Sequence, residues 1–257
     1  MRRATFTALS LLMAVSLVPD PASAFGNNDP AKKSCAGCHT LTREEADAAL
    51  RGMADNVVGI VPGPIQGTWE VDASIKGKIY PIYMDYSKKY MIQGQFFRLS
   101  DKENITRLRF ADLNRVDVSS IPLKNAIVLG NGSSKRRIIV LTDPSCPYCV
   151  KLHGAIKEAV AKDPEAAFYV MPYPRNPGDR SAYSKCLAAV CDKSGKILDD
   201  IFSGKTVPPP TCQSGAVDET IRLAERLQTQ GTPSMILPDG RVVTGYMEAD
   251  ALLALTR

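Results

Sequence analysis

The chain has 257 residues, of which 44% are hydrophobic and 23% are charged, and its formal net charge is +5. This composition excludes a disordered chain and an integral membrane protein, and the length allows one sizeable core beside a smaller domain. The positive charge is mild and evenly spread, and the short basic cluster Lys135–Arg137 precedes a predicted strand. Nucleic acid is therefore not an expected partner.

Residues 1–24 have the features of a secretory signal peptide. Two arginines near the N-terminus are followed by the apolar stretch Phe6–Val18 and by Ala22-Ser23-Ala24, the small-residue pattern that signal peptidase cuts. The apolar stretch is shorter than the roughly 20 residues of a membrane-spanning helix. We therefore expect cleavage before Phe25 and export of the mature protein, where disulfides can persist.

The next segment, residues 25–67, contains the motif Cys35-Ala36-Gly37-Cys38-His39. This spacing is that of c-type haem attachment, in which both thiols bind the haem vinyl groups and the histidine is the proximal ligand. A second dithiol or a local disulfide beside a chance histidine is the alternative. Both interpretations stay open, so a covalent haem at Cys35, Cys38 and His39 is a hypothesis.

The sequence from residue 40 to residue 126 predicts a short helix, a break, a small β domain at 68–110 and a helical linker. Thr42 and Glu45 form a capping-box pattern that opens a short helix through Met53, and the Gly/Pro-rich stretch 59–67 breaks the chain. Residues 68–110 then alternate in short antiparallel strands, expected at 69–72, 79–85 and 90–99. So small a sheet buries little by itself and would gain from pairing with a second copy or another domain. Residues 111–126 are the linker.

The larger domain, residues 127–257, has the order of a mixed α/β fold. We expect strands at 137–143 and 167–173, a helix at 149–162, a long helical insertion at 180–228, a hairpin at 233–246 and a closing helix at 248–256. This order combines parallel and antiparallel strand pairs.

The motif Cys146-Pro147-Tyr148-Cys149 follows the first of these strands and opens the helix. Free N–H groups and the dipole at a helix start favour a Cys146 thiolate, and Cys149 one turn on can resolve a mixed disulfide. The alternatives are a permanent disulfide, or half of a zinc site with His153. The position after a buried strand favours the redox role.

These residues resemble bacterial periplasmic thiol:disulfide interchange proteins of the DsbC/DsbG type. Residues 142–153 are similar to that family's active-site segment, residues 231–240 to its cis-proline loop, and Gly94-Gln95, more weakly, to its dimerisation domain. The resemblance implies a thioredoxin-like domain, a V-shaped homodimer, a periplasmic location, misoxidised proteins as substrates and a membrane electron donor of the DsbD type.

The same resemblance implies the roles of individual residues. Cys146 would attack, Cys149 would resolve, and Tyr148, Thr232 and Pro233 would bind the substrate, with a cis bond between Thr232 and Pro233. The pair Pro147-Tyr148 is the glutaredoxin dipeptide, whereas isomerases of this type often have Gly-Tyr. That departure leaves the balance between isomerase, reductase and oxidase open, and the dimerisation-like domain favours isomerase or reductase.

Three further cysteines lie in the predicted insertion. Cys191 and Cys212 fit the family's structural disulfide, which would contribute about 3 kcal/mol in the chain-entropy model. Cys186 is left over as a buried thiol or an alternative partner for either neighbour. Disulfide exchange requires no cofactor. The competing function is a c-type haem electron carrier or binding protein in which the thioredoxin-like fold is only a scaffold.

Overall fold

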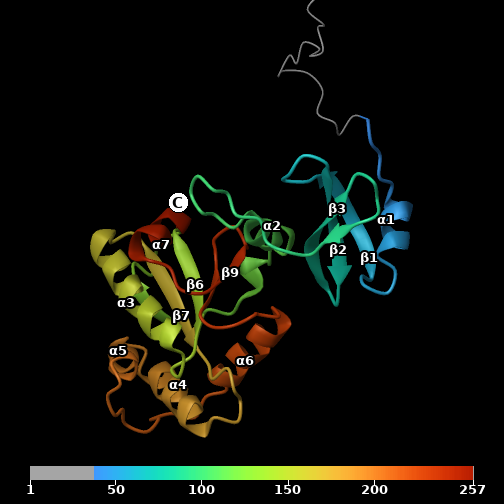
Figure 1. Ribbon diagram of the computed structural model, residues 1–257. Coiled ribbons are helices and arrows are strands. Elements are labelled where there is room, and N and C mark those ends of the chain that lie inside the picture. The colour runs from blue at the N-terminus through green and yellow to red at the C-terminus, as the bar shows by residue number, and fades with distance from the viewer. Residues whose placement is uncertain (1–37, 257) are drawn as a thin grey trace, which may run out of the picture. The chain divides into compact units, whose positions relative to one another are not determined.

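The computed structural model describes residues 38–256, which contain the two sheets shown in Figure 1. The predicted signal peptide and Cys35 lie outside these residues. No helix in this range is long and apolar enough to cross a membrane.

The first sheet is antiparallel throughout, with the order β1-β2-β3-β4. Its strands and two flanking helices are α1 (Arg43–Ala49), β1 (Asn56–Pro62), β2 (Thr68–Ile75), β3 (Lys78–Asp85), β4 (Met91–Ile92) and α2 (Ile105–Leu113). β1 extends into the stretch 59–67 that the sequence predicted as a break. Gly59 sits at a register shift there, and a Cβ atom at this residue would come within 2.9 Å of the Asp72 carboxylate. The missing side chain makes room for the bulge.

Helix α1 covers one face of this sheet. The predicted capping box is confirmed, because Thr42 Oγ1 accepts from the Glu45 N–H and the Glu45 carboxylate accepts from the Thr42 N–H. The helix ends at Ala49, before the predicted Met53. Leu50 and neighbouring apolar residues of α1 form a buried cluster with Val57, Trp69 and Val71. The small sheet therefore has a core of its own, contrary to the expectation that it would bury little.

Helix α2 covers the opposite face, where alternate residues of β2 are acidic. The Arg109 guanidinium lies 2.6 Å from the Glu70 carboxylate and 2.7 Å from that of Asp72. Burial raises the pKa of Asp72 despite the nearby guanidinium. Two buried carboxylates on one strand thus share one cation from the helix.

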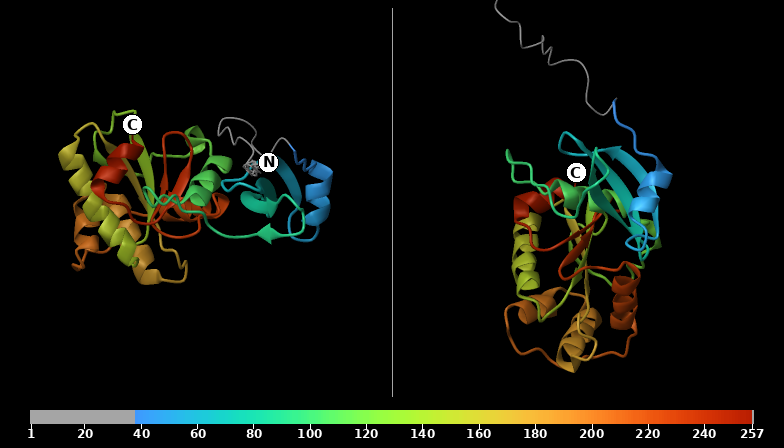
Figure 2. Two further views of the ribbon diagram at one scale, coloured as in Figure 1. Left: turned by 45° about the horizontal axis from the view of Figure 1, so that its top comes forward. Right: turned by 45° about the vertical axis from the view of Figure 1, so that its right-hand side comes forward.

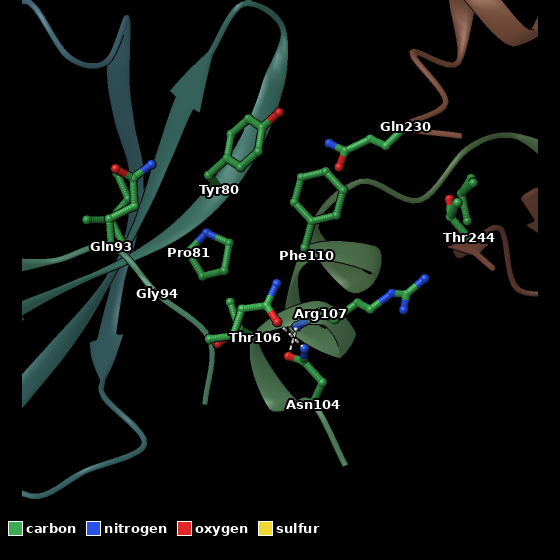
Figure 3. A pocket seen from close by; sticks show the side chains of 13 residues that line it. Tyr80, Pro81, Gln93, Gly94, Asn104, Thr106, Arg107, Phe110, Gln230 and Thr244 are labelled. Carbon is green, nitrogen blue, oxygen red and sulfur yellow. Dashed lines mark hydrogen bonds between the residues drawn. The ribbon is translucent and has the colours of Figure 1, made fainter. Parts of the chain in front are cut away.

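Aromatic packing continues the contact between α2 and the sheet. The rings of Tyr80 on β3 and Phe110 on α2 lie 5.0 Å apart. Both rings border a pocket of about 560 Å³, which Figure 3 shows from close by. Its other lining residues are mostly uncharged and polar, and none of them is a cysteine.

The second sheet has the order β5-β7-β6-β8-β9, in which only β6 and β7 run parallel. Its elements and the preceding 3₁₀ turn are η2 (Val118–Ser120), β5 (Ile127–Gly130), β6 (Arg137–Thr142), α3 (Pro147–Lys162), β7 (Ala167–Pro172), α4 (Arg180–Asp192), α5 (Lys196–Phe202), α6 (Ala216–Arg226), β8 (Ser234–Ile236), β9 (Val242–Thr244) and α7 (Ala249–Leu255). The predicted mixed α/β fold with a helical insertion is confirmed.

Side chains that alternate along β6 pack into two core layers, one on each face of the sheet. Ile138 and Val140 pack in one cluster with apolar residues of α3 and α7, whereas Ile139 and Leu141 pack in another with Leu223 and its neighbours on α6. Helices α3 and α6 accordingly lie on opposite sides of this sheet (Figures 1 and 2). Burial on both faces makes β6 the central strand, and its carboxyl end leads directly into the cysteine motif.

We expect Arg109→Met to destabilise the protein, because it leaves the carboxylates of Glu70 and Asp72 buried without their cation. Hydrogen bonds to charged groups contribute roughly 1.5–3 kcal/mol, so the free energy of unfolding should fall by about 2 kcal/mol or more. Chemical denaturation at neutral pH measures this change. Arg107→Met, an exposed arginine on the same helix, is the control and should have little effect. Equal losses in the two variants would contradict the ion-pair account.

Candidate active site

The cysteine motif stands where β6 ends and α3 begins. The Cys146 N–H donates to the Asp143 carbonyl oxygen over 3.1 Å and closes the turn. Cys146 is the N-cap of α3, and Pro147 is the first helical residue. Proline suits this position because its missing N–H would have no intrahelical partner there. The turn therefore places the Cys146 sulfur at the free N–H groups of the helix.

The surroundings of Cys146 favour its thiolate. Burial opposes ionisation, but hydrogen bonds from Thr232, the Cys149 N–H and side chain, and the Tyr148 N–H outweigh it, so the pKa of Cys146 lies below its ordinary value. The two backbone donors belong to the first turn of α3, where an N-cap side chain normally accepts. A sulfur anion here takes the place that a serine or aspartate oxygen occupies in other helices.

The loop before β8 faces this sulfur. The Thr232–Pro233 peptide bond is cis, and the Cys146 Sγ atom lies 3.3 Å from the Thr232 carbonyl oxygen. The Thr232 hydroxyl is buried and has no hydrogen-bond partner within residues 38–256 while the thiol is protonated. It is placed to donate to the sulfur once that sulfur ionises. Thr232 and Pro233 are thus beside Cys146, although they are far from it in sequence.

Cys149 has a different environment one turn further along α3. Its side chain is 1% exposed, and its sulfur accepts from the Asp143 N–H over 3.3 Å. Burial, only partly offset by that bond, raises the pKa of Cys149 to about 12. At neutral pH the outer thiol is therefore the better source of a thiolate, and the inner thiol keeps its proton.

The first turn of α3 also presents an open surface beside the dithiol. Tyr148 is 60% exposed and Val150 is 40% exposed. The Lys151 ammonium lies 5.8 Å from the centre of the Tyr148 ring. An incoming polypeptide can therefore approach Cys146 along a mixed apolar and cationic face.

The remaining cysteines of the insertion do not join this site. Cys191 and Cys212 form a disulfide with an S–S distance of 2.01 Å. Cys186 is buried in α4 among apolar residues of α4 and α6, including Val190 and Val217, and burial raises the pKa of its thiol well above the ordinary value. Its burial makes Cys186 part of the packing of the insertion.

His153 bonds to the insertion. Its Nε2 atom lies 2.6 Å from the Asp199 carboxylate, and its ring packs 4.8 Å from that of Phe202. No group of three or more histidine, cysteine or acidic side chains that could hold a metal ion occurs between residues 38 and 256. The zinc alternative for Cys146, Cys149 and His153 is thus not supported in this range.

The haem motif is only partly described. Cys35 lies outside the described residues, whereas Cys38 and His39 are both exposed. A covalent haem is normally held against apolar side chains that control solvent access. The described surroundings of Cys38 and His39 do not fit that requirement.

Comparisons with known proteins identify the family of the chain. A family profile described as a thioredoxin-like domain matches residues 123–257, more than half of the chain. The thiol:disulfide interchange protein DsbC of Escherichia coli (strain K12) is 30% identical over 169 residues, which cover 64% of this chain and 68% of that protein. The chain belongs to the DsbC-type thiol:disulfide interchange proteins.

Two further matches have similar identity. A probable DsbC of Bordetella avium (strain 197N) is 27% identical over 194 residues, which cover 75% of this chain and 66% of that protein. A solved disulfide interchange protein from Neisseria gonorrhoeae is 27% identical, covers 53% of this chain and 96% of its own, and superposes with a TM-score of 0.46. The chain spans about two thirds of the length of these curated DsbC relatives. Membership of this family places it among thiol:disulfide oxidoreductases.

The sequence interpretation missed Asp143 as a residue of this site. The residue lies inside the motif that carries the resemblance, but neither spacing nor periodicity assigns it a partner. An acidic residue directly after an apolar strand was the available signal, because a buried carboxylate must find hydrogen-bond donors.

We expect Cys146 to be alkylated before Cys149, because its pKa is lowered while that of Cys149 is raised. Iodoacetamide at mildly acidic pH, applied to the reduced protein and followed by peptide mapping, measures the order. As the pH rises, Cys146 should gain reactivity first, and Cys149 should stay protected below strongly alkaline pH. Equal or reversed labelling would overturn the assignment of the attacking thiol.

Proposed function

We propose that the chain exchanges disulfides in exported proteins, with Cys146 as the attacking thiol and Cys149 as the resolving thiol. The observation that carries this proposal is the contrast between the two sulfurs. Cys146 is an N-cap thiol with a lowered pKa, and Cys149 is a buried thiol with a raised pKa on the next turn. Such a pair provides one nucleophile and one reserve thiol.

In the proposed reaction, the Cys146 thiolate attacks one sulfur of a substrate disulfide. A mixed disulfide forms, and the other substrate sulfur leaves as a thiolate. If that thiolate or another substrate thiol attacks the mixed disulfide, Cys146 is regenerated and the substrate disulfide has been rearranged. If Cys149 loses its proton and attacks Cys146 Sγ instead, the substrate leaves reduced and a Cys146–Cys149 disulfide remains.

Isomerase or reductase activity is preferred to oxidase activity. Isomerase and reductase activity both need a reduced dithiol, and a membrane electron donor of the DsbD type would supply the electrons. The substrates would be misoxidised proteins in the periplasm, since residues 1–24 have the pattern of a signal peptide. The Thr232–Pro233 loop and Tyr148 would contact the substrate chain beside Cys146. No cofactor takes part, because both electrons pass between sulfur atoms.

We expect Cys146→Ala to abolish both insulin reduction and the refolding of scrambled ribonuclease, since it removes the nucleophile. Cys149→Ala should lose insulin reduction but retain part of the refolding activity, because a substrate thiol can still release the mixed disulfide. Cys186→Ala is the matched control and should remain active, as that thiol is outside the site. Activity that survives in Cys146→Ala would contradict the proposed function.

We propose further that the mature protein is a homodimer formed through the small β domain. The sheet has its own core, so the need to bury its faces no longer supports this proposal. Support comes instead from the edge strand β4 and the residues on either side of it, where four large apolar side chains are exposed: Tyr90, Ile92, Phe97 and Leu99. An unpaired edge with apolar neighbours is suited to pairing with a second copy.

We expect the mature chain to sediment as a dimer at micromolar concentration and Ile92→Lys to shift it towards monomer. A charge at the edge strand should oppose both burial and strand pairing. Val128→Lys is the control, because Val128 is about equally exposed but lies on β5 of the other sheet. A monomeric wild-type chain would refute the dimer and favour a simple reductase.

A further inference from the structure

The Asp143 carboxylate is buried directly beneath the turn that carries the dithiol. Asp143 is 5% exposed and follows the last residue of β6. An aspartate with so little exposure to solvent must satisfy its carboxylate oxygens mainly by hydrogen bonds within the protein. Its hydrogen bonds therefore show what it holds in place.

Each oxygen accepts from a different segment of backbone. Oδ1 accepts from the Ser145 N–H over 2.8 Å, in the turn that precedes Cys146. Oδ2 accepts from the Arg175 N–H over 3.0 Å, in the loop that follows β7. The parallel pairing of β6 and β7 ends at Thr142 and Pro172. The Asp143 carboxylate extends the link between these two segments beyond the ends of the strands.

The backbone of the same residue contacts both cysteines. The Asp143 carbonyl oxygen accepts from the Cys146 N–H, and the Asp143 N–H donates to the Cys149 sulfur. A rotation of this residue would therefore move a donor away from one cysteine and an acceptor away from the other. The side-chain bonds to residues 145 and 175 oppose that rotation.

Other titratable or charged groups interact with Asp143 or with its neighbours. Cys149 from α3 accepts from the Asp143 N–H, and the charge of Asp143 acts on Tyr173 after β7 and on Cys186 in α4. Arg175 also acts on Tyr173, and Asp179 and Lys185 also act on Cys186. The negative charge of Asp143 disfavours further anions here, and it contributes to the raised pKa values of Tyr173 and Cys186. Charge alone would therefore make Asp143 an obstacle to a Cys146 thiolate.

We propose that Asp143 is a positioning residue for the dithiol, whose carboxylate fixes the turn between β6 and α3 so that the Cys146 sulfur stays at the helix N-terminus. This inference rests on the proposed function of Cys146. The positioning effect of Asp143 stabilises the Cys146 thiolate, whereas the negative charge of Asp143 would destabilise it. Loss of the carboxylate should weaken the hydrogen bonds that N–H and hydroxyl groups donate to Cys146 Sγ. The Cys146 thiolate should therefore become less stable rather than more stable.

The test uses Asp143→Ala and Asp143→Asn in the full mature chain. Alanine removes both acceptors, whereas asparagine keeps one carbonyl oxygen and puts an NH₂ group in place of the other. Asp179→Asn is the matched control. It removes a neighbouring carboxylate, and its remaining oxygen can still accept from the Ala182 N–H at the start of α4. The pH dependence of Cys146 alkylation by iodoacetamide is measured for each reduced protein, with thermal unfolding as a check on folding.

We expect the midpoint for Cys146 alkylation to rise by about half a pH unit or more in Asp143→Ala, which is roughly a threefold loss of rate at mildly acidic pH. The midpoint of Asp143→Asn should lie between those of the alanine variant and the wild type. The midpoint of Asp179→Asn should match that of the wild type. An unchanged or lower midpoint in folded Asp143→Asn would overturn the positioning role, whether or not the alanine variant folds. If Cys146 of the wild type were alkylated with the midpoint of an ordinary cysteine, the proposed function would be overturned as well. Failure of the positioning role and failure of the proposed function are therefore distinguishable.

Discussion

The start of α3 is the feature on which the rest of the site depends. The first N–H groups of a helix have no partners within the helix, and a side chain at the N-cap usually supplies an acceptor. In α3 the N-cap is Cys146, which makes no side-chain capping bond as a thiol. Loss of its proton produces the missing acceptor, so the helix stabilises the anion specifically. Burial of Leu152, Ile156 and other residues of α3 against the sheet keeps this helix end fixed at the carboxyl end of β6.

Depth within the same helix separates the chemistry of the two thiols. Cys149 lies one turn further into the core, where burial outweighs the single backbone donor from Asp143. A resolving thiol that holds its proton reacts slowly with a mixed disulfide, because only the thiolate attacks. A delay of this kind gives a second thiol of the substrate time to react first. The burial of Cys149 thus favours rearrangement over net reduction in the proposed reaction, without any change in the order of events at Cys146.

Periodicity and cysteine spacing predicted the catalytic half of the chain well, for identifiable physical reasons. β6 is an apolar run with a core layer on each face, α3 has one buried stripe, and the Pro238-Asp239-Gly240 turn joins β8 to β9. Prediction was poorer for the small sheet. β1 was hidden by its glycines and prolines. Alternation in β2 placed Glu70 and Asp72 on one face but did not indicate that α2 covers this face. A single sequence shows which residues share a face but not which helix covers it.

The two buried aspartates show why the polar parts of the structure were the hardest to foresee. Asp72 is paired with Arg109, a side chain 37 residues away, and such a pair requires a particular helix to fold back onto the sheet. Asp143 is held by backbone N–H groups of Ser145 and Arg175, which any residue other than proline could supply. No residue type in the sequence marks those donors, because only the path of the chain brings them together. The path is set by the parallel pairing of β6 with β7, so the apolar packing of that strand pair determines where the carboxylate is satisfied. Through the same backbone it determines how the two sulfurs of the dithiol are held.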